Sequence, residues 1–160
     1  TPDMTPVPFA TLDAHLLIQI AISSNNVKEQ IPKDTLEPLG ESVEMTAYID
    51  SDHAGDKVTR RSCTGVLIFL NRSPIFWYSK KQSSIETSSF GSEFSAMKTG
   101  TELIEGLCYK LRMMGVPIDG PCHVKADNLS VVRNSSQPES ILKKKSNSIA
   151  FHYVWERAAA

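Results

Sequence analysis

The 160-residue sequence lacks the features that mark several large classes of protein. Its three cysteines, Cys63, Cys108 and Cys122, include no C-x-x-C pair, which argues against a disulfide framework and a zinc site and favours a reducing compartment. No apolar run reaches the roughly 18 residues that a membrane-spanning helix needs, so no membrane partner is expected. The net charge is −1, so contact with a nucleic acid would have to come from a local basic patch.

The first 42 residues differ in composition from the rest of the chain. Prolines cluster at both ends of this segment, around one apolar stretch from Leu12 to Ile22 that could form a short helix. Proline-rich segments of this kind are typical of linkers. We therefore predict a linker over 1–42 and a folded domain over 43–160. The first residue is Thr1 and no signal peptide is visible, so we expect a piece of a longer protein.

Hydrophobic periodicity predicts an α/β domain. The expected elements are strands at 43–50, 63–71 and 75–82, a long helix at 89–114, a fourth strand at 121–127 and helices at 128–136 and 149–160. Ser88 or Ser89 is expected to cap the long helix and Gly115 to end it. Short loops predict that the first three strands form an antiparallel meander. The helical connection that follows predicts a mixed sheet with helices against it.

Three acids fall where such a fold gathers side chains. We expect Asp50 at the end of the first strand, Glu93 in the first turn of the long helix and Asp127 at the end of the fourth strand. If the first and fourth strands are neighbours, the three carboxylates converge. Clustered carboxylates repel one another, and a divalent cation with oxygen ligands, such as Mg²⁺, relieves that repulsion. Solvated acids scattered over strand ends remain the alternative.

Basic side chains follow the same strands. Arg60 and Arg61 come after the first strand, Lys80 lies near the end of the third, and Lys143–Lys145 precede the last helix. Each group could contact phosphates, and a solvated charged surface is the alternative.

Four consecutive stretches carry a specific resemblance. They are YIDSDHAGDKVTRRSCTG, FWYSKKQSSIETSSFGSEF, TELIEGLCYKLRMMGVPIDGP and KADNLSVVRNSSQPESILKKKSNSIAFH. In this order they resemble the ribonuclease H domain of copia-type long-terminal-repeat retrotransposon polyproteins, over residues 35–157 of this chain.

The resemblance implies a ribonuclease H-like mixed sheet of three antiparallel strands and a parallel fourth. It implies hydrolysis of the RNA strand of RNA–DNA hybrids by a two-metal mechanism with Mg²⁺ or Mn²⁺. The expected partner is the reverse transcriptase domain of the same polyprotein, and the expected location is a cytoplasmic virus-like particle or the nucleus.

The resemblance also assigns residues. The family's three acids fall on Asp50, Glu93 and Asp127, which would be both catalytic residues and metal ligands. Glu86 is a lower-ranked candidate for the second acid, and Asp52 is expected outside the ligand set. Arg60, Arg61, Lys80 and Asn128 are the candidates for nucleic-acid contacts, Asn128 through the minor groove of a hybrid.

Family members continue with a further strand and a helix that brings a fourth acid, so a C-terminally truncated domain is expected. One alternative function is a catalytically inactive structural domain of the same fold that supports duplex binding. A more remote one is an integrase-like nuclease. The order Asp, Glu, Asp along the chain favours ribonuclease H, because integrases carry Asp, Asp, Glu.

Overall fold

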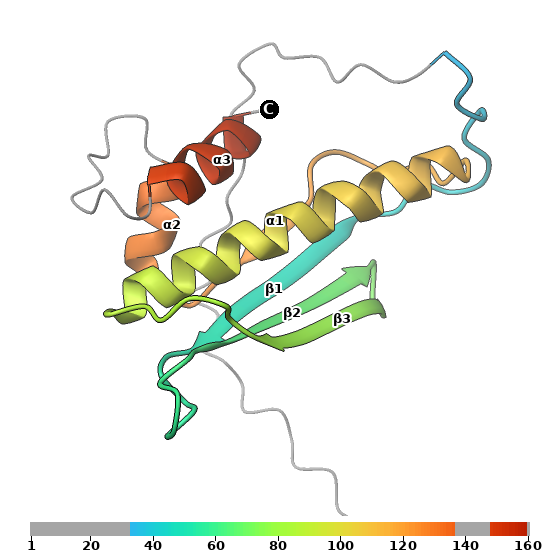
Figure 1. Cartoon of the computed structure of the whole chain (residues 1–160). Coiled ribbons are helices and arrows are strands. Elements are labelled where there is room, and N and C mark those ends of the chain that lie inside the picture. The colour runs from blue at the N-terminus through green and yellow to red at the C-terminus, as the bar shows by residue number, and fades with distance from the viewer. Residues whose placement is uncertain (1–32, 137–147, 160) are drawn as a thin grey trace, which may run out of the picture.

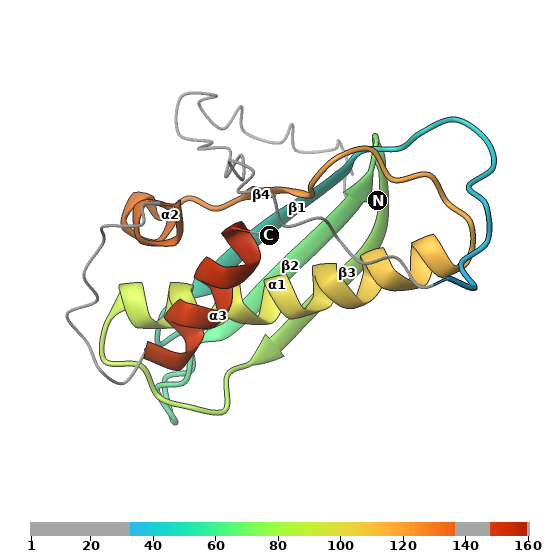
Figure 2. The same cartoon turned by 90° about the horizontal axis from the view of Figure 1, so that it is seen from above.

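A computed structural model describes residues 33–136 and 148–159 of the chain (Figure 1). In these residues the long helix packs on one face of a four-stranded sheet, and the last two helices pack against that helix. The view from above shows the long helix crossing the strands obliquely (Figure 2). The predicted helix at 12–22 and Lys143–Lys145 lie outside the described residues. Residues 33–42, the end of the predicted linker, form no helix or strand, and the Leu39 N–H donates to the Gly115 carbonyl at 3.0 Å.

The order of elements follows the prediction. The elements are β1 (Met45–Asp52), β2 (Cys63–Leu70), β3 (Ser73–Lys81), α1 (Ser89–Met113), β4 (His123–Lys125), α2 (Leu129–Ser136) and α3 (Ser148–Ala159). The strands lie in the order β3-β2-β1-β4. The first three pair antiparallel, and β4 pairs parallel to β1. The predicted mixed α/β sheet is confirmed, and its arrangement is compatible with a ribonuclease H-like fold.

Several predicted strand boundaries are wrong: β1 is shifted two residues toward the C-terminus, β3 begins two residues earlier than expected, and β4 is shorter. β1 runs two residues further than expected because its ladder with β2 continues to the pair Asp52 and Cys63. Asp50 therefore lies within the strand, opposite Gly65. β4 has three residues in place of the seven predicted, because its ladder with β1 covers only His123–Lys125.

β3 is an edge strand with a bulge near its start. Ile68 pairs with Phe76 but Phe69 pairs with Pro74, which leaves Ile75 as the extra residue. A proline is tolerated here because an edge strand does not need every N–H for a neighbour.

α1 begins and ends at the predicted signals. The Ser88 hydroxyl accepts a hydrogen bond from the Gly91 N–H at 3.2 Å, which is the N-cap interaction. Gly115, just beyond the helix, has a φ of +75°, a conformation that favours glycine. No helix in the described part of the chain is both long and apolar enough to cross a membrane.

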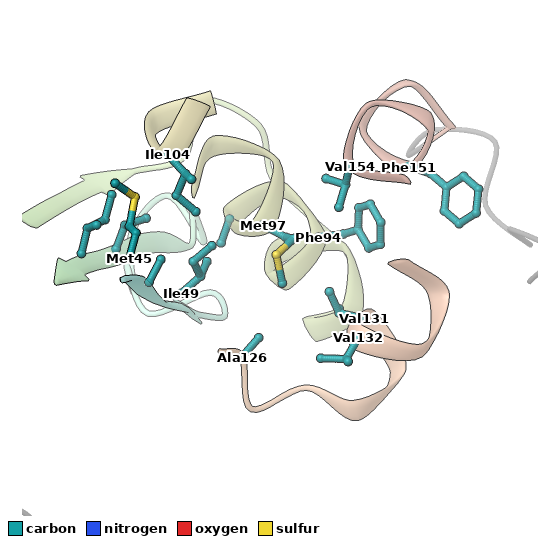
Figure 3. Packing of buried hydrophobic residues seen from close by; sticks show 14 of the residues in the cluster. Met45, Ile49, Phe94, Met97, Ile104, Ala126, Val131, Val132, Phe151 and Val154 are labelled. Atoms are coloured by element: carbon teal, nitrogen blue, oxygen red, sulfur yellow. The ribbon is translucent and has the colours of Figure 1, made fainter. Parts of the chain in front are cut away.

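The core lies between α1 and the sheet and extends under the last two helices (Figure 3). Phe94 of α1 is fully buried and stacks on Phe151 of α3, with ring centroids 6.0 Å apart. Further along α1, a Cβ at Gly100 would come within 2.2 Å of Ile49 Cδ1 on β1. The buried Ile49 side chain therefore occupies the space that a side chain at residue 100 would need.

Candidate metal centre

Three carboxylates from three parts of the fold meet at one place. Asp50 comes from β1, Glu93 from α1 and Asp127 from the turn between β4 and α2. One oxygen of each lies within 4.8 Å of the others. The predicted convergence of these three side chains is confirmed.

The parallel pairing of β1 and β4 places Asp50 beside Asp127. Tyr48 pairs with Lys125, and each of the two acids follows its paired residue by two positions. In a parallel pair both chains run in the same direction, so equal steps from a paired position end at the same level of the sheet. Asp50 and Asp127 are both exposed, which leaves this side of the cluster open to solvent.

Glu93 approaches the two aspartates from the helix. The prediction placed it in the first turn of α1, but that turn holds no acid, and Glu93 lies in the second because the helix begins at Ser89. Ser92 and Phe94, on either side of it, are fully buried. Glu93 itself is half-buried, between the core and the open edge of the cluster.

The electrostatic surroundings of Glu93 disfavour its charged form. Burial, followed by the negative charges of Asp127 and Asp50, raises the pKa of Glu93 to about 7. Within residues 33–136 and 148–159, no Lys, Arg or His forms an ion pair with any of the three acids. Near neutral pH the cluster therefore carries negative charge that these residues do not balance.

The donor set indicates which ions fit. All three groups are carboxylates, with no thiol or imidazole among them. Oxygen-only donors suit hard cations such as Mg²⁺ and Mn²⁺, and Mg²⁺ retains waters, so a few carboxylates suffice. The backbone N–H of Ser51 donates to Asp50 Oδ1 at 2.7 Å, which leaves the other oxygen of that carboxylate for a metal.

The two other acids considered from the sequence lie outside this cluster. The Asp52 carboxylate packs over Gly55, where an added Cβ would come within 1.7 Å of Asp52 Oδ2. Glu86 accepts a hydrogen bond from the Ser84 hydroxyl at 3.3 Å. Of the two candidates for the second acid, Glu93 is the one that reaches Asp50 and Asp127.

The basic residues predicted to contact nucleic acid are solvent-exposed. Arg60 and Arg61 lie in the loop between β1 and β2, and Lys80 lies on β3. Arg60 has a φ of +57°, and its N–H donates to the Asp56 carbonyl at 2.7 Å. These contacts hold the loop, and nucleic-acid binding by the three side chains stays a prediction.

Asn128 has a local structural role. Its Oδ1 accepts hydrogen bonds from the N–H groups of Ser130 and Val131, at 3.0 and 3.2 Å. It therefore caps the start of α2. The predicted minor-groove contact would have to be made by the remaining amide nitrogen, and it too stays a prediction.

A buried polar layer beside Glu93 was missed by the sequence analysis. Ser92, Gln82 and Thr64 are all buried next to the acid cluster. Ser92 Oγ lies 3.2 Å from His53 Nδ1. The signal available in the sequence was weak: a glutamine that directly follows a strand, and a serine beside a candidate acid.

Known proteins resemble most of the chain. Two retrovirus-related Pol polyproteins of Arabidopsis thaliana, from transposons RE1 and RE2, are 28% and 26% identical to it over 115 residues. This match covers 72% of the chain but only 8% of each polyprotein. The uncharacterized mitochondrial protein AtMg00810 of the same plant is 42% identical over 60 residues, or 37% of this chain and 25% of that protein. No protein-family model matches. The relatives therefore support a region of a retrotransposon polyprotein, without specifying which domain.

Proposed function

We propose that this chain is the ribonuclease H domain of a retrotransposon reverse transcriptase, hydrolysing the RNA strand of RNA–DNA hybrids with Mg²⁺ or Mn²⁺. The observation that carries the proposal is the convergence of Asp50, Glu93 and Asp127 within 4.8 Å. Their order along the chain is Asp, Glu, Asp, and the similarity to Pol polyproteins supports the same assignment.

In this proposal Asp50, Glu93 and Asp127 hold the metal. A pair of divalent ions bound there would supply an activated water and stabilise the leaving oxygen of the cleaved phosphodiester. The chain contributes the geometry: β1 and β4 hold the two aspartates at one level, and α1 holds Glu93 against them. The raised pKa of Glu93 means that metal binding releases protons when the pH is below about 7.

Basic side chains near this end of the sheet would suit a polyanionic substrate. Lys80 pairs with Thr64, and Thr64 pairs with Ser51, the neighbour of Asp50. Lys80 therefore lies two strands from Ser51, roughly 10 Å away across the sheet. The loop that carries Arg60 and Arg61 leaves β1 at the same end of the sheet. These side chains could hold backbone phosphates on either side of the scissile bond.

The test is a cleavage assay on the purified chain. A labelled RNA–DNA hybrid is incubated with Mg²⁺ or Mn²⁺, alongside single-stranded RNA and duplex DNA of the same sequence. We expect internal cuts only in the RNA of the hybrid, and loss of those cuts in Asp50→Asn. Hybrid binding without cleavage would instead support a structural domain that holds the duplex, and cutting of duplex DNA would support an integrase-like nuclease. Within the polyprotein we expect the reverse transcriptase domain as partner, in a virus-like particle.

A further inference from the structure

Gln82 is a buried polar residue that connects the sheet to the start of α1. It follows β3 directly, and only 7% of its surface is exposed. Its side-chain Nε2 donates two hydrogen bonds, to Thr64 Oγ1 on β2 at 3.0 Å and to the Ser92 carbonyl on α1 at 2.9 Å. A carbonyl oxygen only accepts, so the amide nitrogen has to face Ser92. Gln82 thus uses both of its side-chain donors to join two elements.

Ser92 forms hydrogen bonds through its N–H, its hydroxyl and its carbonyl oxygen. Its N–H donates to the Ser88 carbonyl at 3.2 Å, and its hydroxyl donates to the Ser89 carbonyl at 2.9 Å. Because that hydroxyl has no second proton to give, the 3.2 Å contact with His53 Nδ1 is one in which the histidine donates. Ser92 is fully buried. His53 and Gln82, which directly follow β1 and β3, therefore both tie Ser92 to the sheet, and Gln82 is the one that binds its backbone carbonyl.

The residue after Ser92 is Glu93. Neighbouring residues on an α-helix are separated by about 100° around its axis. Fixing the Ser92 backbone against the sheet therefore adds to the core packing of α1 and holds the start of the helix in the rotation that presents Glu93 to Asp50 and Asp127. Without this anchor, repulsion among the three carboxylates would favour turning or fraying the start of the helix until Glu93 moved away.

The Gln82 amide is a costly choice for a residue that only fills the core. Its Oε1 is buried and accepts no hydrogen bond from the described residues. An apolar side chain of the same length would avoid burying that oxygen. The amide therefore serves its two hydrogen bonds, to Thr64 and to Ser92, and the bond to Ser92 is the one that reaches α1.

We propose that Gln82 is a positioning residue for the metal centre, which holds the Glu93 carboxylate in place through its hydrogen bond to the Ser92 carbonyl. The inference rests on the proposed function, because it requires the three acids to bind a divalent cation.

The test measures metal affinity in addition to cleavage. Mn²⁺ binding is followed by titration calorimetry in the wild-type chain, Asp50→Asn, Gln82→Met and Thr64→Val, at a temperature where circular dichroism shows each to be folded. Gln82→Met keeps the length of the side chain and removes both donors. Thr64→Val removes one partner of Gln82 but leaves its bond to Ser92, so it is the matched control.

We expect Gln82→Met to weaken Mn²⁺ binding about tenfold, a loss typical of removing a group that orients a metal ligand. Thr64→Val should lower the melting temperature but leave the affinity within about twofold, because the link to Ser92 survives. Gln82→Asn, which keeps an amide too short to reach both elements, gives a second reading if Gln82→Met does not fold, with the same tenfold loss expected.

Two failures can be told apart. If the wild-type chain shows no Mn²⁺ binding that depends on Asp50, the proposed function is wrong. If the wild-type chain binds Mn²⁺ in an Asp50-dependent way and the Gln82 variants bind equally well, the positioning role alone is wrong. A Thr64→Val loss as large as that of Gln82→Met would also overturn it, because general loosening of the layer would then explain both.

Discussion

Asp56 and Glu93 are two acids near the same end of the sheet, with opposite surroundings. Asp56 lies in the loop between β1 and β2 and is surrounded by donors. It forms an ion pair with Lys81 and accepts hydrogen bonds from the Thr59 hydroxyl at 2.6 Å and from the N–H groups of Val58 and Thr59 at 3.0 and 3.3 Å. Lys81 first, and then these other donors, hold the pKa of Asp56 well below its ordinary value.

Glu93 has the reverse environment. Burial and two neighbouring carboxylates raise its pKa to about 7. The comparison separates two uses of an acid. The negative charge of Asp56 is stabilised by Lys81 and by hydrogen bonds from Val58 and Thr59, and these contacts hold the loop. The negative charge of Glu93 is disfavoured by burial and by the two neighbouring carboxylates, so the folded chain favours a bound cation there.

The largest effect is expected from removing one charge of the metal centre. Asp50→Asn should lower hybrid cleavage by about 10³-fold, equivalent to ~4 kcal/mol of transition-state stabilisation, because the site loses a ligand. Asp56→Asn should leave the cleavage rate within about threefold, because its carboxylate has only structural partners. Initial rates on a labelled hybrid at saturating Mg²⁺ measure both. Equal losses in the two variants would remove the distinction between the acids.

The next effect tests how α1 brings Glu93 to the aspartates. Gly100→Ala should destabilise the fold by about 1–3 kcal/mol, because the new methyl overlaps Ile49 and pushes the helix off β1. Gly106→Ala is the matched control on the same helix, with no atom within 4 Å of an added Cβ. It should stabilise the fold by about 0.5–1 kcal/mol. Urea denaturation gives both values, and a stabilising Gly100→Ala would contradict the close approach of helix and strand.

A smaller effect concerns pH without divalent cations. The folded-state pKa of Glu93 lies above its ordinary value of 4.5, so protonated Glu93 favours the fold, and this stability is lost as the pH rises through about 7. Glu93→Gln should therefore raise the free energy of unfolding by about 1–2 kcal/mol at pH 8, after allowing for partial exposure, and change it little at pH 5. Urea denaturation in a chelating buffer at the two pH values measures this. A variant less stable than wild type at pH 8 would show that ionised Glu93 does not destabilise the folded state.

The smallest effect is expected at Asp56, and it has the opposite sign. Its folded-state pKa is lowered, so its stabilising contribution is present above its ordinary pKa of 3.8 and is lost as the pH falls through the lower folded-state value. Asp56→Asn should lower the melting temperature slightly at pH 7, and the difference from wild type should shrink in acid and in high salt. Thermal denaturation at two pH values and two salt concentrations tests this. A difference that grows in acid would contradict the assignment.

Local signals explain what the sequence predicted well. Ser88 caps α1 and Gly115 ends it because a side-chain acceptor and a left-handed conformation are properties of single residues. The antiparallel meander follows from loops too short for any other connection. The three acids were found through their place relative to these elements and through family resemblance.

The errors arose where packing between distant parts decides the structure. β4 is short because its register against β1 sets its length, and the composition of 121–127 does not reveal that register. Glu93 was placed one turn early because the cap was left open between Ser88 and Ser89, and the structure uses Ser88. Gln82 was overlooked because its importance depends on Ser92 lying above it, which only the packing of α1 on the sheet determines.

The pairing of β1 with β4 also has a consequence for the order of folding. β1, β2 and β3 contact strands adjacent in the chain, whereas β4 brings Lys125 to Tyr48 across a separation of 77 positions. Closing so long a loop costs more conformational entropy than forming a hairpin, so we expect the meander to form first and β4 to join it late. Asp127 arrives with β4. The binding of a divalent cation by all three acids would therefore report that β4 has joined the sheet.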